Sequence, residues 1–134
     1  MVENHDFLPT VLDYLGLKNE TPTSPPLPGK SFAPVLRGAN IPWDNVIFHE
    51  FENTRMIRTP KWKLTLRHPY GPDELYDMEK DPDEKENLIS VPEYSSPKND
   101  LHKKLVAFFE RYADPKYDLW KGGATKGTDI LREK

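Results

Sequence analysis

Four histidines are the side chains of this sequence best suited to proton transfer or metal binding near neutral pH. They are scattered along the chain without the spacing of a helical metal-binding motif: His5, His49, His68 and His102. His49 stands beside Glu50 in an apolar run, but neighbouring residues of a strand face opposite sides. We therefore interpret His49 as structural, and His102, on a polar helix face, as solvated.

A covalent catalyst needs an activated nucleophile, and the sequence shows no motif for one. The 134 residues contain no cysteine and no Gly-x-Ser-x-Gly segment. The absence of cysteine also excludes disulfides and thiolate metal sites. The acidic run 77–86 lacks the central glycine and the spaced ligands of a calcium loop. We predict no catalytic residue, no metal site and no cofactor in this chain.

Opposite charges are concentrated in two adjacent segments. Residues 55–68 hold five cations and no acid, whereas residues 73–86 hold eight acids and two lysines. The first interpretation is that the segments lie side by side and neutralise each other. The alternative is that the basic segment faces an anionic ligand. A nucleic-acid contact through the cations and Trp62 is disfavoured, because the neighbouring acids and the net charge of −3 would repel phosphate.

Apolar spacing predicts two helices that flank a β region. An apolar stripe predicts an amphipathic helix over 5–15, and a proline-rich extended segment follows over 17–30. A longer apolar face predicts a helix over 97–113. No apolar run approaches the roughly 18 residues of a membrane helix, so we expect no membrane partner.

Strand patterns fill the middle of the chain. Apolar runs and alternation predict strands at 45–51, 54–59, 62–67 and 74–77. The first strand is expected to be buried, and one helical turn is expected at 84–88. The fold class is therefore α+β, with an antiparallel sheet of about four strands packed by the C-terminal helix.

Several segments, in order, resemble parts of type I, arylsulfatase-like sulfatases. They are Asp6-x-x-Pro9-Thr10, Pro28-Gly29-Lys30-Ser31-Phe32, Arg55-x-x-Arg58-Thr59-x-x-Trp62-Lys63, and Glu74-Leu75-Tyr76-Asp77 followed by Asp81-Pro82 and Asn87-Leu88. The last is the most specific, since it is similar to the ELYDLxxDPxExxNL signature near the C-terminus of these enzymes. The resemblance implies the C-terminal subdomain of the alkaline-phosphatase-like sulfatase fold. Residues 77–88 themselves suit turns that return the chain to the core.

The resemblance also implies what this chain lacks. Such sulfatases use a formylglycine, made within a Cys/Ser-x-Pro-x-Arg motif, and a calcium ion, both held by the N-terminal domain. The segments around Ser31 and Ser90 do not match that motif. The resemblance therefore implies a bacterial C-terminal fragment that is inactive alone, with a parent enzyme that is periplasmic or secreted.

These inferences divide the chain into three parts. Residues 1–44 would trail from the parent catalytic domain, 45–115 would form the α+β subdomain, and 116–134 would be an irregular tail. The expected partner is the catalytic domain, with self-association through the helix 5–15 in its absence. The subdomain would wall the substrate cleft, with His49, Arg55, Arg58 and His68 as rim residues. The alternative is a free-standing module that binds a sulfated or phosphorylated glycan through the hairpin 55–68.

Overall fold

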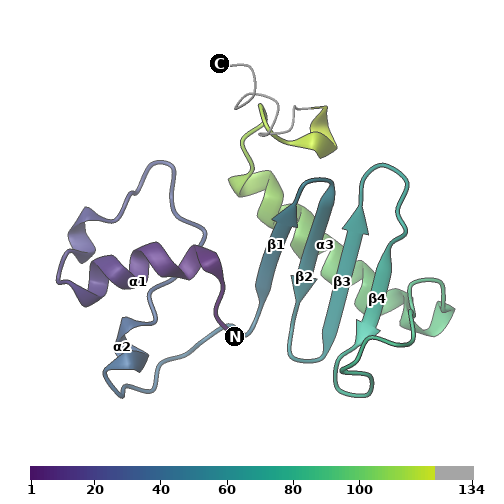
Figure 1. Cartoon of the computed structure of the whole chain (residues 1–134), viewed down its shortest axis with the longest axis horizontal. Coiled ribbons are helices and arrows are strands. Elements are labelled where there is room, and N and C mark those ends of the chain that lie inside the picture. The colour runs from purple at the N-terminus through teal and green to yellow at the C-terminus, as the bar shows by residue number, and fades with distance from the viewer. Residues whose placement is uncertain (123–134) are drawn as a thin grey trace. The chain divides into compact units, whose positions relative to one another are not determined.

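The computed structural model describes residues 1–122, and the chain divides into two compact units. The N-terminal unit is Met1–Ile47 and the C-terminal unit is Phe48–Lys134 (Figure 1). The irregular tail expected over 116–134 lies partly outside the described residues. Of the helices within residues 1–122, none is both long enough and apolar enough to cross a bilayer.

A four-stranded sheet with strand order β1-β2-β3-β4 forms the centre of the C-terminal unit. Its strands are β1 (Ile47–Phe51), β2 (Thr54–Arg58), β3 (Trp62–Arg67) and β4 (Glu74–Asp77). Ile57 is paired with Leu64, and Leu64 with Leu75, so one row of fully buried side chains crosses three strands. The expected α+β fold is confirmed.

The helix α3 (Ser95–Tyr112) covers one face of this sheet (Figure 1). Leu101, Leu105 and Phe109 point into the core from one side of the helix, as their spacing predicts. The helix begins two residues earlier than the expected Pro97. A 3₁₀ turn at Pro92–Tyr94 leads directly into it, so the chain is already helical at Ser95.

The expectation that the first strand is buried is wrong. β1 lies at the edge of the sheet, and Phe51 is 70% exposed. Phe48 contributes to the packing, because its ring stacks on Phe108 with centroids 4.0 Å apart. An apolar run marks a strand, but it does not distinguish a central strand from an edge strand that is covered on one side.

The helical turn expected at 84–88 is absent, and side-chain capped turns take its place. The Asp81 carboxylate accepts the N–H of Glu86 at 2.8 Å. The Asn87 Oδ1 accepts the N–H of Leu75 at 3.1 Å, and the Leu88 N–H donates to the Leu75 carbonyl at 2.8 Å. Asn87 and Leu88 thus close the chain onto β4, and the prediction of turns in the acidic signature is confirmed.

Short helices and polar contacts form the N-terminal unit. The expected helix 5–15 is a 3₁₀ turn at Asn4–Asp6 followed by α1 (Phe7–Tyr14), with a second 3₁₀ turn at Lys18–Glu20. After the proline-rich segment, α2 (Ala33–Leu36) forms one short turn of helix. Gly29 passes close to the first 3₁₀ turn. A Cβ at this position would lie 2.0 Å from the His5 carbonyl oxygen, so no larger residue fits there.

Two buried polar side chains connect the beginning of α1 to the segment that precedes α2. The Asp6 carboxylate accepts the N–H of Lys30 at 2.8 Å. The Thr10 hydroxyl donates to the Asp6 carbonyl at 2.6 Å and accepts the N–H of Phe32 at 3.0 Å. The sequence segments around Asp6 and Lys30 therefore form one structural motif.

Candidate functional site

Arg55, one of the four predicted rim residues, is an internal residue of the C-terminal unit. It is 7% exposed, and its guanidinium donates to Glu50 at 2.8 Å and to Asp118 at 2.7 Å. The same group lies 4.1 Å from the centre of the Phe109 ring. Since its charge and donors are used within the fold, Arg55 is a structural residue and does not suit a rim.

Sequence reasoning missed Asp118, which is 2% exposed. It accepts from Arg55, and its Oδ1 also caps the N–H of Trp120 at the start of the 3₁₀ turn Leu119–Lys121. The first residues of the expected irregular tail are therefore docked on the sheet. The two partners are 63 positions apart, and no local pattern signals such a pair.

His68 lines a groove of about 380 Å³ between α3 and the β3–β4 turn. Its ring packs on Trp120, with centroids 5.3 Å apart. Lys98 and His102 of α3 form the opposite wall. At the tip of the turn, the side chain of Tyr70 is 94% exposed. This end of the unit offers nitrogen donors and aromatic rings to a polar ligand.

His49 and Arg58 lie on the other face of the sheet from Arg55. Phe48 and Glu50 of β1 contact groups on the α3 side, so the intervening His49 points away from the helix. In β2, Arg55 and Ile57 face α3 by the same alternation, which places Arg58 on the open face. The four predicted residues therefore do not form one cluster.

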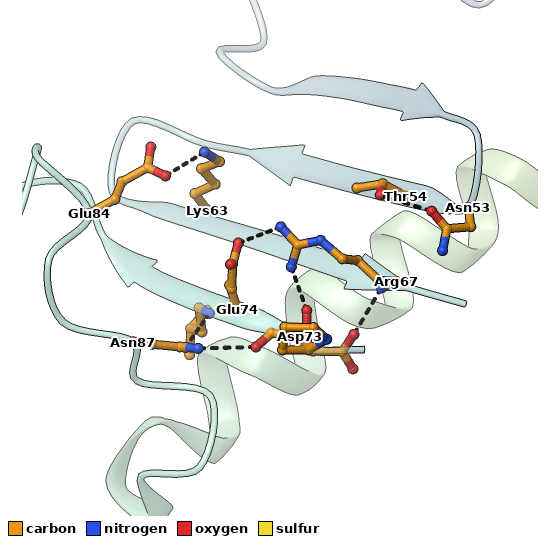
Figure 2. Close-up of polar contacts among 10 residues, drawn as sticks. Asn53, Thr54, Lys63, Arg67, Asp73, Glu74, Glu84 and Asn87 are labelled. Atoms are coloured by element: carbon orange, nitrogen blue, oxygen red, sulfur yellow. Dashed lines mark hydrogen bonds and ion pairs between the residues drawn. The ribbon is translucent and has the colours of Figure 1, made fainter. Parts of the chain in front are cut away.

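On this open face, the basic and acidic segments pair as the charge pattern predicts. Figure 2 shows Lys63 bonded to Glu84 at 2.6 Å and Arg67 bonded to Glu74 at 3.0 Å. Arg67 also donates to the Pro72 carbonyl. Burial raises the pKa of Tyr76 above its usual value, and the charges of Glu74 and Glu84 add to that shift. Most cations of residues 55–68 are thus paired with carboxylates of the same unit.

Calcium and formylglycine, which the resemblance implies for a parent enzyme, do not fit the residues described. Within residues 1–122, no three acidic or histidine side chains gather as a metal site would require. The Ser31 hydroxyl donates to Asp13 at 2.7 Å and accepts the N–H of Ala33, as a helix cap does. No catalytic step is therefore assigned to these groups in this chain.

Comparison with known proteins shows where this combination of sheet and helix occurs. The family profile "N-sulphoglucosamine sulphohydrolase, C-terminal" matches residues 1–111. The chain belongs to this sulfatase C-terminal family. It is 34% identical to a Delta 4,5-hexuronate-2-O-sulfatase of Bacteroides thetaiotaomicron over 99 residues, which cover 67% of this chain and 20% of the relative.

Two further comparisons extend the match across the family. An arylsulfatase of Clostridium perfringens is 31% identical over 136 aligned positions, covering 98% of this chain and 26% of the relative. The crystal structure of a phosphonate monoester hydrolase of Agrobacterium radiobacter shares the fold, with a TM-score of 0.68 at 24% identity over 82% of this chain and 25% of that chain. The sulfatase C-terminal chain thus spans about a quarter or less of the relatives it matches.

Proposed function

We propose that this chain is the C-terminal part of a sulfuric ester hydrolase. In this proposal it packs on the catalytic region, helps to wall the substrate cleft and supplies no catalytic group. Family membership supports the enzyme class. The relatives' greater length supports a catalytic region beside it, because the match covers only 20% and 26% of the two sulfatases.

The observation that carries the proposal is the exposed apolar surface of the N-terminal unit. Phe7 is 69% exposed and Leu15 is 64% exposed. These side chains line a shallow groove of about 270 Å³ with Val11, Phe32 and Leu36, among others. Contiguous exposed apolar surface marks an interaction site. A catalytic region that covered it would remove this surface from water.

The C-terminal unit would contribute to the cleft through side chains that are exposed or half-buried. His49 on β1 and His68 beside the groove stay as rim candidates. Arg55 does not, because its guanidinium is bonded to Glu50 and Asp118. A wall of this kind excludes water and orients the leaving group. Tyr70, at the tip of the β3–β4 turn, would add an aromatic contact.

The alternative, a free-standing module for sulfated or phosphorylated glycans, would need unpaired cations in the hairpin 55–68. Four of the five cations there have a carboxylate partner: Arg55, Lys61, Lys63 and Arg67. That pairing favours the sulfatase proposal. A heparin disaccharide titrated into the isolated chain should therefore produce no saturable binding.

A chimera tests the proposed function directly. The last quarter of the Clostridium perfringens arylsulfatase is replaced by this chain, and calcium-dependent hydrolysis of an aryl sulfate is measured. We expect the chimera to fold and to hydrolyse the ester, while the purified 134-residue chain shows no turnover. Turnover by the isolated chain would contradict the proposal, since it would require a catalytic group here.

Variants of the apolar surface test the packing. Phe7→Asp combined with Leu15→Asp should abolish soluble, active chimera, because two charges would be buried against the catalytic region. Val106→Asp, at a partly exposed apolar position of α3, is the matched control and should be tolerated. Equal activity of both variants would show that the apolar surface of the N-terminal unit is not the packing face.

A further inference from the structure

Arg58 differs from every other cation of the basic segment. Among residues 1–122 its side chain has no ion pair and no hydrogen bond, whereas the other cations are paired. Its Nε is out of reach of water and has no acceptor. An unpaired guanidinium on a partly buried residue is costly, so its retention calls for a partner at the Nη nitrogens, which are not covered as Nε is.

The surroundings of Arg58 add to this cost. Its cross-strand partner is Lys63, so two cations stand directly opposite each other on the open face of the sheet. Glu84 neutralises Lys63 at 2.6 Å, as Figure 2 shows, and leaves Arg58 with the unbalanced charge. In the C-terminal unit, α3 covers the opposite face (Figure 1). On the open face, Arg58 is therefore the cation of residues 55–68 whose charge is left without a partner among residues 1–122.

We propose that Arg58 binds an aspartate or glutamate side chain of the catalytic region, and that the open face around it is a docking face. This inference rests on the proposed function. The guanidinium suits a carboxylate, since its planar donors match the two oxygens. Carboxylates of this chain already fill that role for the other cations of the segment.

A substrate anion is a poorer occupant for Arg58 than a fixed carboxylate. A substrate must enter and leave at every turnover, so it is bound best by an exposed guanidinium that can use all of its donors. The Nε of Arg58 is covered, which leaves the Nη nitrogens for a partner, and the residue as a whole is only partly exposed. Such a placement suits a permanent partner that remains in position after folding.

The proposal predicts opposite effects of one substitution in two contexts. In the isolated chain, Arg58→Met removes an unpaired charge opposite Lys63, so the thermal midpoint should stay or rise. In the arylsulfatase chimera the same change leaves a carboxylate without its partner, so the midpoint should fall by several degrees. The midpoint of the Arg58→Lys chimera should lie between those of the unmodified chimera and the Arg58→Met chimera, because a lysine keeps the charge but loses the paired donors.

Lys61→Met is the matched control, since Lys61 forms an exposed pair with Glu79 at 3.7 Å and should change neither midpoint appreciably. A lower midpoint of isolated Arg58→Met would overturn the proposal, because Arg58 would then act within this chain. Equal midpoints of the chimera with and without Arg58→Met would overturn it too. So would a raised KM at an unchanged midpoint, which would assign Arg58 to the substrate. A chimera that fails to fold even unmodified would instead count against the proposed function, and the isolated-chain measurement would still test Arg58.

Discussion

The two units of the chain are stabilised by different interactions. The C-terminal unit buries large aliphatic side chains between sheet and helix, and Ile57, Leu64, Leu75 and Leu105 are almost fully enclosed. Within residues 1–47 the buried residues are Asp6, Pro9, Thr10 and Ala33, none of which is large and apolar. The N-terminal unit is instead connected by hydrogen bonds from Asp6 and Thr10.

This difference indicates which unit can stand alone. Burial of apolar surface is the main favourable term of folding, while a hydrogen bond adds only about 1 kcal/mol net. The C-terminal unit has its own core, and the N-terminal unit exposes the apolar side chains that a core would need. A catalytic region that packed on the N-terminal unit would supply the missing burial.

The largest expected effect comes from truncating the core of the C-terminal unit. Leu105→Ala should destabilise the isolated chain by about 2–5 kcal/mol, because it leaves a cavity between α3 and the sheet. Urea unfolding followed by tryptophan fluorescence measures the change. Leu15→Ala, at an exposed position of the N-terminal unit, is the control and should stay within about 0.5 kcal/mol. Equal effects of the two changes would remove the distinction between the units.

The second effect tests whether residues 114–122 belong to the C-terminal unit. Asp118→Ala leaves the Arg55 guanidinium with Glu50 alone, so we expect a loss of about 3 kcal/mol, the low end for breaking a buried pair. The urea midpoint measures it, and trypsin should cut the released tail faster. Asp114→Ala, at an exposed position, is the control. If the two variants have the same urea midpoint and the same rate of tryptic cleavage, the Arg55–Asp118 pair does not hold residues 114–122 on the sheet.

Residues with local signals were predicted well from the sequence. The predicted strands 62–67 and 74–77 have the observed bounds of β3 and β4. Turn chemistry explained why Asp77, Asp81 and Asn87 need no ligand, since each caps backbone N–H groups. Proline and glycine punctuation likewise placed residues 21–30 outside regular helices and strands, although Lys18–Glu20, at the start of the predicted extended segment, form a 3₁₀ turn. In each case a few neighbouring residues determine the structure.

Features that depend on distant parts of the chain were not predicted. The edge position of β1 depends on which strands pair, and the apolar run 45–51 does not encode that. The burial of Arg55 depends on Asp118, 63 positions away. That Arg58 has no partner among residues 1–122 depends on which carboxylates its neighbours bind, and this is set by the fold. Charge counting correctly predicted neutralisation of the segment, but it could not identify the cation left over.

A smaller effect distinguishes the units by pH. In the N-terminal unit, the hydrogen bond from Ser31, then that from Arg37, lowers the pKa of Asp13. In the C-terminal unit, the backbone N–H groups of Glu86 and Lys85 lower the pKa of Asp81. A folded-state pKa below the unfolded one gives stability that is present above about pH 4 and lost as the pH falls through the folded value.

Single substitutions should therefore remove the acid response from one unit at a time. Asp13→Asn should flatten the pH dependence of amide protection in α1 below about pH 4 and leave β4 unchanged. Asp81→Asn should flatten it near residues 81–88 and leave α1 unchanged. Two-dimensional NMR of the isolated chain provides both measurements. Loss of the acid response in both units from one substitution would show that they unfold together.

The smallest expected effect is weak self-association of the isolated chain through the N-terminal unit. α1 has eight residues, too few for a helix to persist in water without packing. Without a catalytic region, its exposed apolar surface can be covered by a second copy of the chain, a contact favoured at high concentration. We expect light scattering to show a dimer that dissociates on dilution, and α1 amides that exchange faster than those of β3. Phe7→Asp with Leu15→Asp should keep the chain monomeric, while the control Val106→Asp should still dimerise. A monomer at all concentrations whose α1 amides are as protected as those of β3 would mean that the hydrogen bonds of Asp6 and Thr10 alone stabilise the N-terminal unit.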